Sequence, residues 1–150
     1  MSQTKGRGRK KALITGFGSV MLFVLAFTVL FFFNFRTIEV QGPSMEPTLK
    51  TGRRLLVSSA YWLIGPIKKG DIVVVHLKDK DDIVIKRVLG LGGDKIDPNN
   101  WPDQHSLTEG DYTVPQGQVF IVGDNRLQSE DSRTFGPVTR GEVIGKVVIW

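Results

Sequence analysis

The 150-residue chain begins with one long apolar segment and continues as short apolar runs separated by polar residues. The long segment, residues 12–33, is a run of 22 residues without a charged side chain. An α-helix rises about 1.5 Å per residue, so this run would be roughly 33 Å long, enough to cross the hydrocarbon core of a bilayer. The pattern therefore predicts a transmembrane helix over residues 12–33.

After residue 34 the apolar runs are short, rich in Val and Ile, and bounded by Gly, Pro and Asp. Such runs are typical of β-strands, and no later stretch has a persuasive helical period. The predicted strands are Thr37–Val40, Arg54–Ser59, Asp71–Leu77, Asp82–Leu89, Gln118–Val122 and Val143–Trp150. Residues 78–81 should form a polar hairpin turn and residues 98–112 a long loop. The fold class is mainly β: a small β-barrel or twisted-sheet domain, residues 34–150, that follows one N-terminal transmembrane helix.

A cleavable secretory signal and a buried helix of a soluble protein are the alternatives for the apolar segment. A secretory signal usually has a shorter apolar region followed by a small-residue cleavage site. Here the residues that follow are Asn34-Phe35-Arg36-Thr37, which contain no Ala-x-Ala pattern. A helix that is apolar on all sides rarely stays in water. A retained membrane anchor is therefore favoured.

The basic charge of the chain is concentrated at its N-terminus. Residues 1–11 contain no acid and five cations, namely Lys5, Arg7, Arg9, Lys10 and Lys11. Without them the 20 Lys+Arg of the chain fall to 15, equal to its 15 Asp+Glu, so no basic face for nucleic acid is indicated. Basic residues flanking a span favour the cytoplasmic side. We expect residues 1–11 to be a cytoplasmic tail, disordered over residues 2–11, and the β domain to be extracytoplasmic, so that the chain is a single-pass protein of the cell membrane.

Ser44 is the first residue that could carry chemistry, and it lies in a Pro-bounded turn soon after the apolar segment. Gly42 lets backbone approach closely there, and Pro43 and Pro47 stiffen the turn. An isolated serine in such a turn is usually a solvated surface residue. It becomes a nucleophile when a neighbouring base removes its proton.

Lys86 could be that base, because it lies inside the otherwise apolar run Ile83–Leu89. Strand alternation puts Lys86 and Arg87 on opposite faces, so one of the two cations must point toward the buried face. Burial disfavours the ammonium form and lowers a lysine pKa, whereas arginine stays charged. Lys86 is therefore the candidate base. The alternative is an edge-strand lysine that points into water.

A third candidate segment is the polar loop Gly123–Arg133, which follows the apolar strand Gln118–Val122. A loop of this kind either supports a site through hydrogen bonds or is an ordinary solvated turn. The chain has two histidines, His76 and His105, and no cysteine. Neither histidine has a recognisable nucleophile context or an acidic cluster, so a Ser-His-Asp triad and a metal site are both disfavoured.

These segments, in this order after an apolar anchor, resemble the type I signal peptidases, the bacterial leader peptidases with a Ser/Lys dyad. The resemblance extends from the anchor to the C-terminus and is nearest to the single-anchor Gram-positive form. The matching segments are Ser44–Leu49 (nucleophile motif), Lys69–Val74 (structural strand), Ile85–Val88 with Gly90 and Gly93–Asp94 (base motif), Gly123–Arg126 with Ser129, Asp131, Ser132 and Arg133 (last catalytic box), and Gly145–Lys146 (final strand). Each segment alone is a weak or moderate signal, but five in order are highly specific.

The resemblance implies a membrane-bound serine endopeptidase that removes signal peptides from exported preproteins through an acyl-enzyme, without metal or cofactor. It implies Ser44 as nucleophile and Lys86 as general base. Supporting roles are implied for Ser129, which would orient the lysine, for Asp131 paired with Arg133, and for Asp124 and Arg126, which would hold the last box together. The backbone N–H of Ser44 would form the oxyanion hole.

Three departures from the family pattern have consequences for these expectations. Gly42 stands where some members have a serine that donates to the oxyanion, so the second donor is open between a backbone group and water. Gly92 stands where a proline commonly precedes Gly93–Asp94, for which we expect only a change in loop stiffness. The short stretch between the base motif and the last box leaves no room for the large second domain of some relatives.

The expected partners are preprotein signal peptides and the lipid bilayer, with the secretion translocon as a further candidate and no nucleic acid. Shallow walls for small substrate side chains would come from Ile38, Val40 and Ile85, which are otherwise ordinary core residues. The apolar segment Tyr61–Ile67 either rests on the membrane interface or is buried. Two other functions stay open: a Ser/Lys peptidase of a specialised secretion or conjugation system, and a catalytically inert, membrane-tethered binding module.

Overall fold

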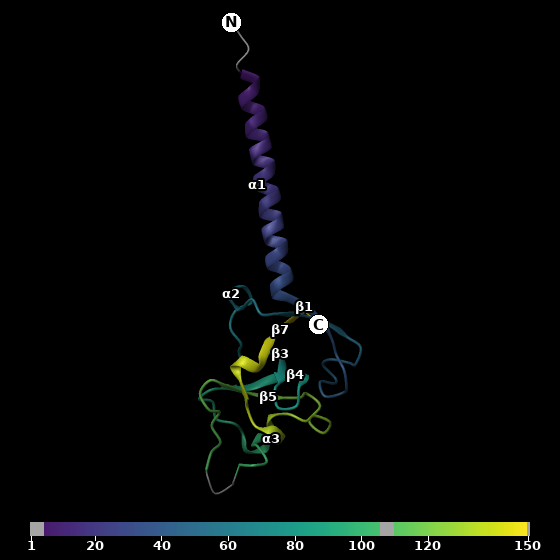
Figure 1. The fold of residues 1–150 in the computed structure, drawn as a ribbon. Coiled ribbons are helices and arrows are strands. Elements are labelled where there is room, and N and C mark those ends of the chain that lie inside the picture. The colour runs from purple at the N-terminus through teal and green to yellow at the C-terminus, as the bar shows by residue number, and fades with distance from the viewer. Residues whose placement is uncertain (1–4, 106–109, 150) are drawn as a thin grey trace. The chain divides into compact units, whose positions relative to one another are not determined.

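The computed structural model describes residues 5–105 and 110–149, with side chains from residue 16 onward. The chain forms two compact units, Met1–Asn34 and Phe35–Trp150. Their secondary structure is shown in Figure 1.

The first unit is the single helix α1, Lys5–Asn34. It contains the predicted span, but it begins at Lys5, so the expected disorder of the basic tail is wrong from that residue on. The stretch Gly16–Asn34 is 19 residues long with a mean hydropathy of 2.3, and none of it is buried. Its length and composition suit a membrane crossing. The side-chain amide of Asn34 donates to the carbonyl of Leu30 at 2.8 Å, which satisfies one of the free carbonyls at the helix end.

The second unit is built on one antiparallel sheet. Within its described residues the strands are β1 (Phe35–Glu39), β2 (Arg54–Ser58), β3 (Ile72–Leu77), β4 (Asp82–Leu91), β5 (Gln118–Val122), β6 (Val138–Thr139) and β7 (Val143–Ile149). Their order across the sheet is β1-β2-β7-β3-β4-β5-β6. β1 and β6 pair with one neighbour each, so the sheet is open at both edges. The prediction of a mainly β domain after one apolar helix is confirmed.

All six predicted strands are present, with small changes at their ends. β1 begins two residues earlier than predicted, and the last residue of the predicted final strand, Trp150, lies outside the described residues. The two-residue strand β6 was too short to give a period-2 signal. Short helical turns were missed for the same reason: α2 (Tyr61–Ile64), η1 (Pro98–Asn100), α3 (Ser132–Phe135) and η3 (Arg140–Glu142).

The predicted hairpin turn joins β3 and β4, whose register pairs Val73 with Lys86. β4 has different partners along its length. Its first half, residues 82–86, pairs with β3 alone, and pairing with β5 begins at Arg87 opposite Val122. Among the described residues, the second edge of this first half has no strand partner. Unpaired backbone groups at such an edge can accept an added strand.

Buried side chains form three clusters, and the first of these lies beneath the turn that carries Ser44. Met45, inside that turn, and Leu49, just after it, are 1% and 0% exposed and pack with residues of β2, β3 and β7. Fully burying such a side chain contributes about 1.5–3 kcal/mol. The turn is therefore anchored to the core of the sheet.

Candidate active site

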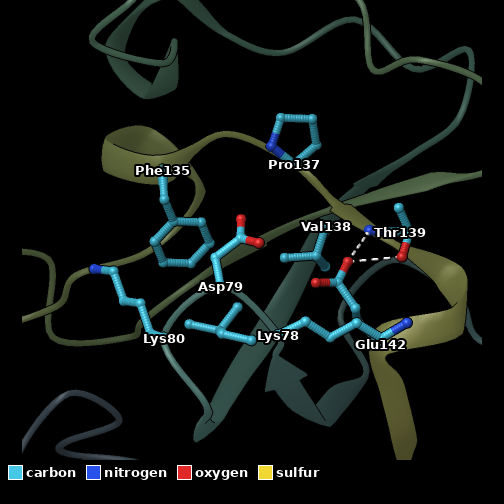
Figure 2. A pocket seen from close by; sticks show the side chains of 9 residues that line it. Lys78, Asp79, Lys80, Phe135, Pro137, Val138, Thr139 and Glu142 are labelled. Atoms are coloured by element: carbon cyan, nitrogen blue, oxygen red, sulfur yellow. Dashed lines mark hydrogen bonds between the residues drawn. The ribbon is translucent and has the colours of Figure 1, made fainter.

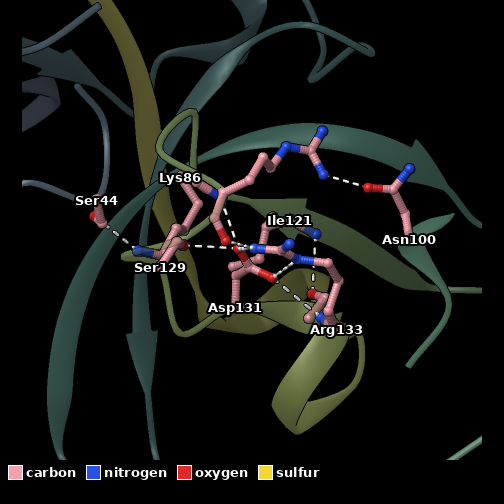
Figure 3. Close-up of polar contacts among 10 residues, drawn as sticks. Ser44, Lys86, Asn100, Ile121, Ser129, Asp131 and Arg133 are labelled. Atoms are coloured by element: carbon pink, nitrogen blue, oxygen red, sulfur yellow. Dashed lines mark hydrogen bonds and ion pairs between the residues drawn. The ribbon is translucent and has the colours of Figure 1, made fainter. Parts of the chain in front are cut away.

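The side chains of Ser44 and Lys86, 42 residues apart in the chain, meet at a hydrogen bond of 2.8 Å between Oγ and Nζ (Figure 3). Lys86 is 3% exposed. The cation next to it, Arg87, has 31% of its side chain exposed. Lys86 is therefore the buried cation of the pair.

Two sets of backbone hydrogen bonds hold Ser44 in place. Inside the turn, the N–H of Glu46 donates to the carbonyl of Pro43 at 3.0 Å. From the polar loop after β5, the N–H of Asn125 donates to the carbonyl of Ser44 at 3.0 Å. The loop and the turn are thus joined directly at the serine, which fixes the position of its hydroxyl relative to β4.

Burial is the main influence on the Lys86 amine and lowers its pKa from the ordinary value of 10.5. The carboxylates of Asp131, Asp82 and Glu130 act in the opposite direction, and the guanidinium of Arg133 adds to the lowering. The net pKa is lowered, so a larger share of the amine is neutral near neutral pH. A neutral amine in contact with a hydroxyl can accept its proton.

Asp131 is the centre of a second, fully bonded cluster in the last box. It is 0% exposed and accepts from the N–H of Gly123 at 2.9 Å, from the hydroxyl of Ser129 at 2.7 Å and from three N–H groups of Arg133 (Figure 3). Burial alone would raise the pKa of the Asp131 carboxyl, but these hydrogen bonds outweigh it and the pKa is lowered. The predicted pairing of Asp131 with Arg133 is present in the structure, at 2.9 Å.

Ser129 does not have the partner that the sequence suggested. In the described part of the chain, its hydroxyl bonds to Asp131 and makes no hydrogen bond to Lys86. The single proton of the hydroxyl goes to the ionised carboxylate of Asp131 in a charge-assisted hydrogen bond. Ser129 therefore supports the loop rather than holding the amine directly.

Asp124 and Arg126 also have partners other than each other. Asp124 accepts two hydrogen bonds from the guanidinium of Arg87, at 2.8 and 2.6 Å, and Arg87 also donates to the carbonyl of Gly70 at 2.8 Å. Arg126 donates to the side chain of Asn100 (Figure 3). The two residues thus connect the last box to β4 and to the long loop. Arg87 was missed, although its position next to Lys86 on the opposite face was the available signal.

Gly123 is a second residue that sequence reasoning missed. A Cβ built on it would lie 2.1 Å from Oγ of Ser129 and 2.6 Å from the carbonyl oxygen of Ser44. No side chain fits there, because the nucleophile turn and the polar loop meet against this backbone. The family motif had included Gly123 in the last catalytic box, but nothing in the sequence indicated this close contact with the nucleophile turn.

The backbone N–H of Ser44 donates to no acceptor among the residues that the structure describes. It is therefore available to a ligand, as the oxyanion expectation requires. Gly42 has a φ of +78°, a conformation that side chains rarely adopt, and open space where a side chain would stand. Gly42 thus leaves open space beside the turn and supplies no side-chain hydrogen-bond donor to an oxyanion.

A groove of about 830 Å³ runs past this pair of side chains. One wall is formed by residues 37–42 with Ser44 and Met45, and the other by residues 81–86. Ile38, Val40 and Ile85, which the family resemblance suggested as substrate walls, all line this groove. Val40 is only 2% exposed, so it is mainly a core residue, whereas Ile38 and Ile85 are partly exposed.

A smaller hollow of about 400 Å³ lies beside the β3–β4 hairpin turn (Figure 2). Phe135 and Val138 form apolar lining, and Lys78 and Glu142 are charged lining residues. The Glu142 carboxylate is already engaged by the N–H and the hydroxyl of Thr139, at 2.7 and 2.6 Å. Neither Ser44 nor Lys86 belongs to its lining.

The two histidines lie outside the Ser44–Lys86 pair. His76 contacts Asp81 at 2.9 Å and His105 contacts the carbonyl of Gly110 at 2.8 Å. Over the described residues, no group of three or more His, Cys, Asp or Glu side chains is placed to hold a metal ion.

Comparison with known proteins matches the family model "Signal peptidase, peptidase S26" to residues 13–102 and 97–150. Signal peptidase I of Bacillus caldolyticus is 39% identical over 143 residues, which cover 77% of this chain and 78% of the relative. Signal peptidase IB of Staphylococcus aureus (strain COL) is 32% identical over 163 residues, which cover 85% of each chain. A crystal structure of a signal peptidase I from Enterococcus faecalis V583 is 26% identical with a TM-score of 0.43, covering 55% of this chain and 97% of that chain. The family match and the two similar sequences establish that this chain belongs to the signal peptidases of peptidase family S26.

Proposed function

We propose that this signal peptidase I removes signal peptides from exported preproteins with Ser44 as its nucleophile and Lys86 as its general base. The observation that carries the two roles is the 2.8 Å contact between the Ser44 hydroxyl and an amine that is 3% exposed. A buried amine of lowered pKa beside a hydroxyl is the arrangement that serine activation without histidine requires.

The reaction begins when the neutral Nζ of Lys86 takes the proton of Ser44 Oγ, and Oγ attacks the carbonyl carbon of the scissile peptide bond. The tetrahedral oxyanion is stabilised by the N–H of Ser44 and a second donor near Gly42, a backbone group or a water molecule. The C–N bond then breaks, and the Lys86 ammonium gives its proton to the departing amine. A water molecule, deprotonated by Lys86, hydrolyses the ester and restores the Ser44 hydroxyl.

The substrate binds as an extended segment in the groove. The unpaired edge of residues 82–86 offers backbone hydrogen bonds, and β1 offers a second free edge on the other wall. Ile38 and Ile85 supply apolar walls that suit small side chains before the cleaved bond. Backbone hydrogen bonds do not depend on the substrate's side chains, so the groove can bind many different sequences. The apolar walls would limit the size of the side chains before the cleaved bond.

The membrane arrangement completes the proposal. Residues 1–11 form a cytoplasmic tail, residues 12–33 cross the membrane, and residues 34–150 form the extracytoplasmic peptidase domain. The supporting observations are the five cations before the apolar helix and its uncharged length. Enzyme and signal peptide then share one bilayer, which raises their effective concentration.

The proposal is tested with the full-length protein in liposomes and a preprotein substrate. Ser44→Ala and Lys86→Met should each lower cleavage by roughly 10⁴-fold or more, because each removes one half of the nucleophile pair. Lys50→Met, which changes an exposed lysine near the same turn, is the matched control and should cleave normally. A serine-directed acylating reagent should label Ser44 in the wild type and fail to label it in Lys86→Met. Normal cleavage by either variant would show that the chemistry is elsewhere, and no cleavage by the wild type would favour an inert binding module.

A further inference from the structure

The groove beside Ser44 is lined by side chains of unequal charge. Three lining residues carry carboxylates, namely Glu39, Asp81 and Asp82, and the one lining residue with an amine is Lys86. In the proposed function Lys86 takes the proton of Ser44 in its neutral form. The groove of the enzyme that is ready to react therefore contains three carboxylates and no cation among its described lining residues.

The alternation of side chains along the two walls places acids and apolar groups on opposite faces. On β1, Ile38 and Val40 pack with the first core cluster, so Glu39 between them faces the other way. On β4, Ile85 packs against the same cluster, so Asp82, three residues earlier, also faces the other way. An extended substrate between the walls would thus have one face beside apolar side chains and the other beside carboxylates.

The three carboxylates differ in how far other groups compensate for their charge. Glu39 lies 4.0 Å from the guanidinium of Arg54, and Asp81 lies 2.9 Å from the ring of His76. Asp82 accepts a hydrogen bond of 2.8 Å from the next backbone N–H in the chain and has no cationic partner within the described residues. Its side chain is exposed at the groove, so Asp82 is the carboxylate most available to a bound ligand.

The position of Asp82 along β4 indicates which part of the substrate it faces. Lys86 marks the cleaved bond, and a strand rises about 3.3 Å per residue, so Asp82 lies about 13 Å from it along the groove. The fourth and fifth substrate residues before the bond lie at about this distance. In the proposed function the first side chain before the bond faces Ile38 and Ile85, so the second and the fourth face the opposite way. The fourth residue is therefore the one that points toward Asp82.

We propose that Asp82 is a specificity residue that favours lysine or arginine at the fourth substrate position before the cleaved bond. This inference rests on the proposed function and deepens it, because it assigns a class of side chain to one position of the bound segment. Opposite charges on neighbouring strands stabilise their pairing, and like charges destabilise it. The long stems of lysine and arginine let the charge reach a carboxylate while it stays hydrated. Glutamate at this position would meet the carboxylates of the groove and bind less well.

A peptide fits these carboxylates better than a metal ion does. Over the described residues, no group of three or more His, Cys, Asp or Glu side chains is placed to hold a metal ion. Glu39 belongs to one wall of the groove, and Asp81 and Asp82 belong to the other. A metal site requires ligands that converge on one point, whereas an extended peptide passes along both walls.

The first test compares three short soluble peptides cleaved by the full-length protein in liposomes. The peptides have alanine at the first and third positions before the bond and differ only at the fourth, which is Lys, Gln or Glu. An exposed charge pair changes binding by up to about fivefold, so kcat/KM of the Lys peptide should exceed that of the Gln peptide about threefold and that of the Glu peptide about tenfold. Both ratios should fall as salt is added, because salt screens exposed charges. Equal rates for the three peptides would overturn this inference and leave the proposed function standing.

The second test changes the charge of Asp82 itself. Asp82→Asn should lower the ratio of Lys to Glu peptide cleavage from about tenfold to about threefold, and Asp82→Lys should reverse the preference. Because Asp82 also raises the pKa of Lys86, the ratio of two peptides at one pH is the measure, since that effect is common to both. An unchanged ratio in Asp82→Lys would overturn the proposal.

Asp79 provides the matched control for these variants. It belongs to the same hairpin turn but lines the smaller hollow of Figure 2 rather than the groove. Asp79→Asn and Asp79→Lys make the same changes of charge and should keep the wild-type ratio. A reversal in Asp79→Lys equal to that in Asp82→Lys would mean that the total charge of the hairpin, and not Asp82, sets the preference, which would also overturn the proposal.

The assigned position is tested by moving the lysine along the peptide. Lysine at the third or fifth position faces away from Asp82, so it should give little gain over glutamine there. An equal gain at the fifth position would overturn the assignment. If the wild type cleaved none of the peptides, the proposed function would fail, but fluorescence anisotropy of the same peptides bound to the protein would still test the preference. Equal Kd values for the Lys and Glu peptides would then overturn it.

Discussion

The Ser44–Lys86 pair and the Asp131 cluster lie in one site but are built in opposite ways. The Lys86 amine is buried with a single hydrogen bond among the described residues, whereas the Asp131 carboxylate is buried with a full set of donors. Burial lowers the pKa of Lys86 and so favours the neutral amine. At Asp131 the hydrogen bonds overcome burial and keep the charged form, so its pKa is lowered as well.

The difference matches the roles of the two groups: the Lys86 amine is placed to react, and the Asp131 carboxylate stabilises the loop. An amine that must take and return a proton gains from having few fixed partners, because each strong bond to the ammonium would hold its proton. A carboxylate that joins a loop to a strand gains from saturation, because an unpaired buried charge is costly. The site therefore contains a pair that is costly to fold and a cluster that compensates for it.

Removing the charge of the supporting cluster should have the largest effect on stability. Asp131→Asn leaves the Arg133 guanidinium without its carboxylate and should cost about 3–5 kcal/mol of unfolding free energy. The Asp131 pKa is lowered in the folded state, so its contribution is present above the ordinary value of 3.8 and is lost as pH falls below it. Chemical denaturation at neutral pH measures the loss. Asp111→Asn, in the exposed pair with Lys95, is the control and should change little. Equal losses in both variants would contradict the comparison.

The second-largest effect should come from adding one methyl group between the polar loop and the nucleophile turn. Gly123→Ala places a Cβ against Ser129 and the Ser44 carbonyl, so the loop and the turn must move apart. A displacement of about 1 Å at a reacting group can cost about 100-fold in rate, and we expect a loss of that order in cleavage of a peptide substrate. Gly141→Ala is the matched control, because a Cβ added there would meet nothing within 4 Å and its φ is ordinary. Full activity in Gly123→Ala would show that the two regions are not tightly coupled.

Burying the Lys86 amine lowers the stability of the fold, so removing the amine should raise the unfolding free energy. Lys86→Met should raise the unfolding free energy by about 0.5–2 kcal/mol while abolishing cleavage. Because the Lys86 pKa is lowered on folding, the cost is greatest at low pH and disappears as pH rises through the unfolded value of 10.5. Melting curves of the full-length protein at several pH values measure this, with Lys50→Met as the exposed control. A destabilised Lys86→Met variant would mean that the amine is a net support.

The smallest effect should be a shift in the pH profile when one carboxylate near the amine is neutralised. Glu130 raises the Lys86 pKa, so Glu130→Gln should lower it further. Activity rises with pH as Lys86 loses its proton, and this limb should move to lower pH by less than about one unit. The rate of peptide cleavage against pH measures the shift. Asp79→Asn, an exposed carboxylate of the hairpin turn, should leave the limb in place. A shift to higher pH in Glu130→Gln would contradict the electrostatic assignment.

The sequence was informative wherever a local rule applied. Val- and Ile-rich runs located the strands. Alternation along β4 showed that one of two adjacent cations faces the buried side, and the ease of neutralising a lysine amine favoured Lys86 over Arg87, as the structure has it. Family motifs located the segments of the site. These signals depend only on residues close together in the sequence, so they can be recognised before the fold is known.

Contacts between distant segments were not predictable in the same way. The meeting of Arg87 with Asp124 depends on where pairing with β5 begins, and the closeness of Gly123 to Ser44 depends on how the loop crosses the turn. For Ser129, the motif indicated a supporting role but not that its hydroxyl would bond to Asp131 rather than to Lys86. Each of these requires register or geometry that a single strand pattern does not contain.

The pairing of β4 with β3 has a consequence for folding fidelity. Val73 stands opposite Lys86 and Ile72 opposite Arg87, and consecutive side chains on a strand face opposite ways. A one-residue slip would exchange the two cations and set a permanently charged guanidinium beside the serine. A misaligned molecule would thus be inert rather than weakly active, so the enzyme acts only in chains that have closed this hairpin in the correct alignment.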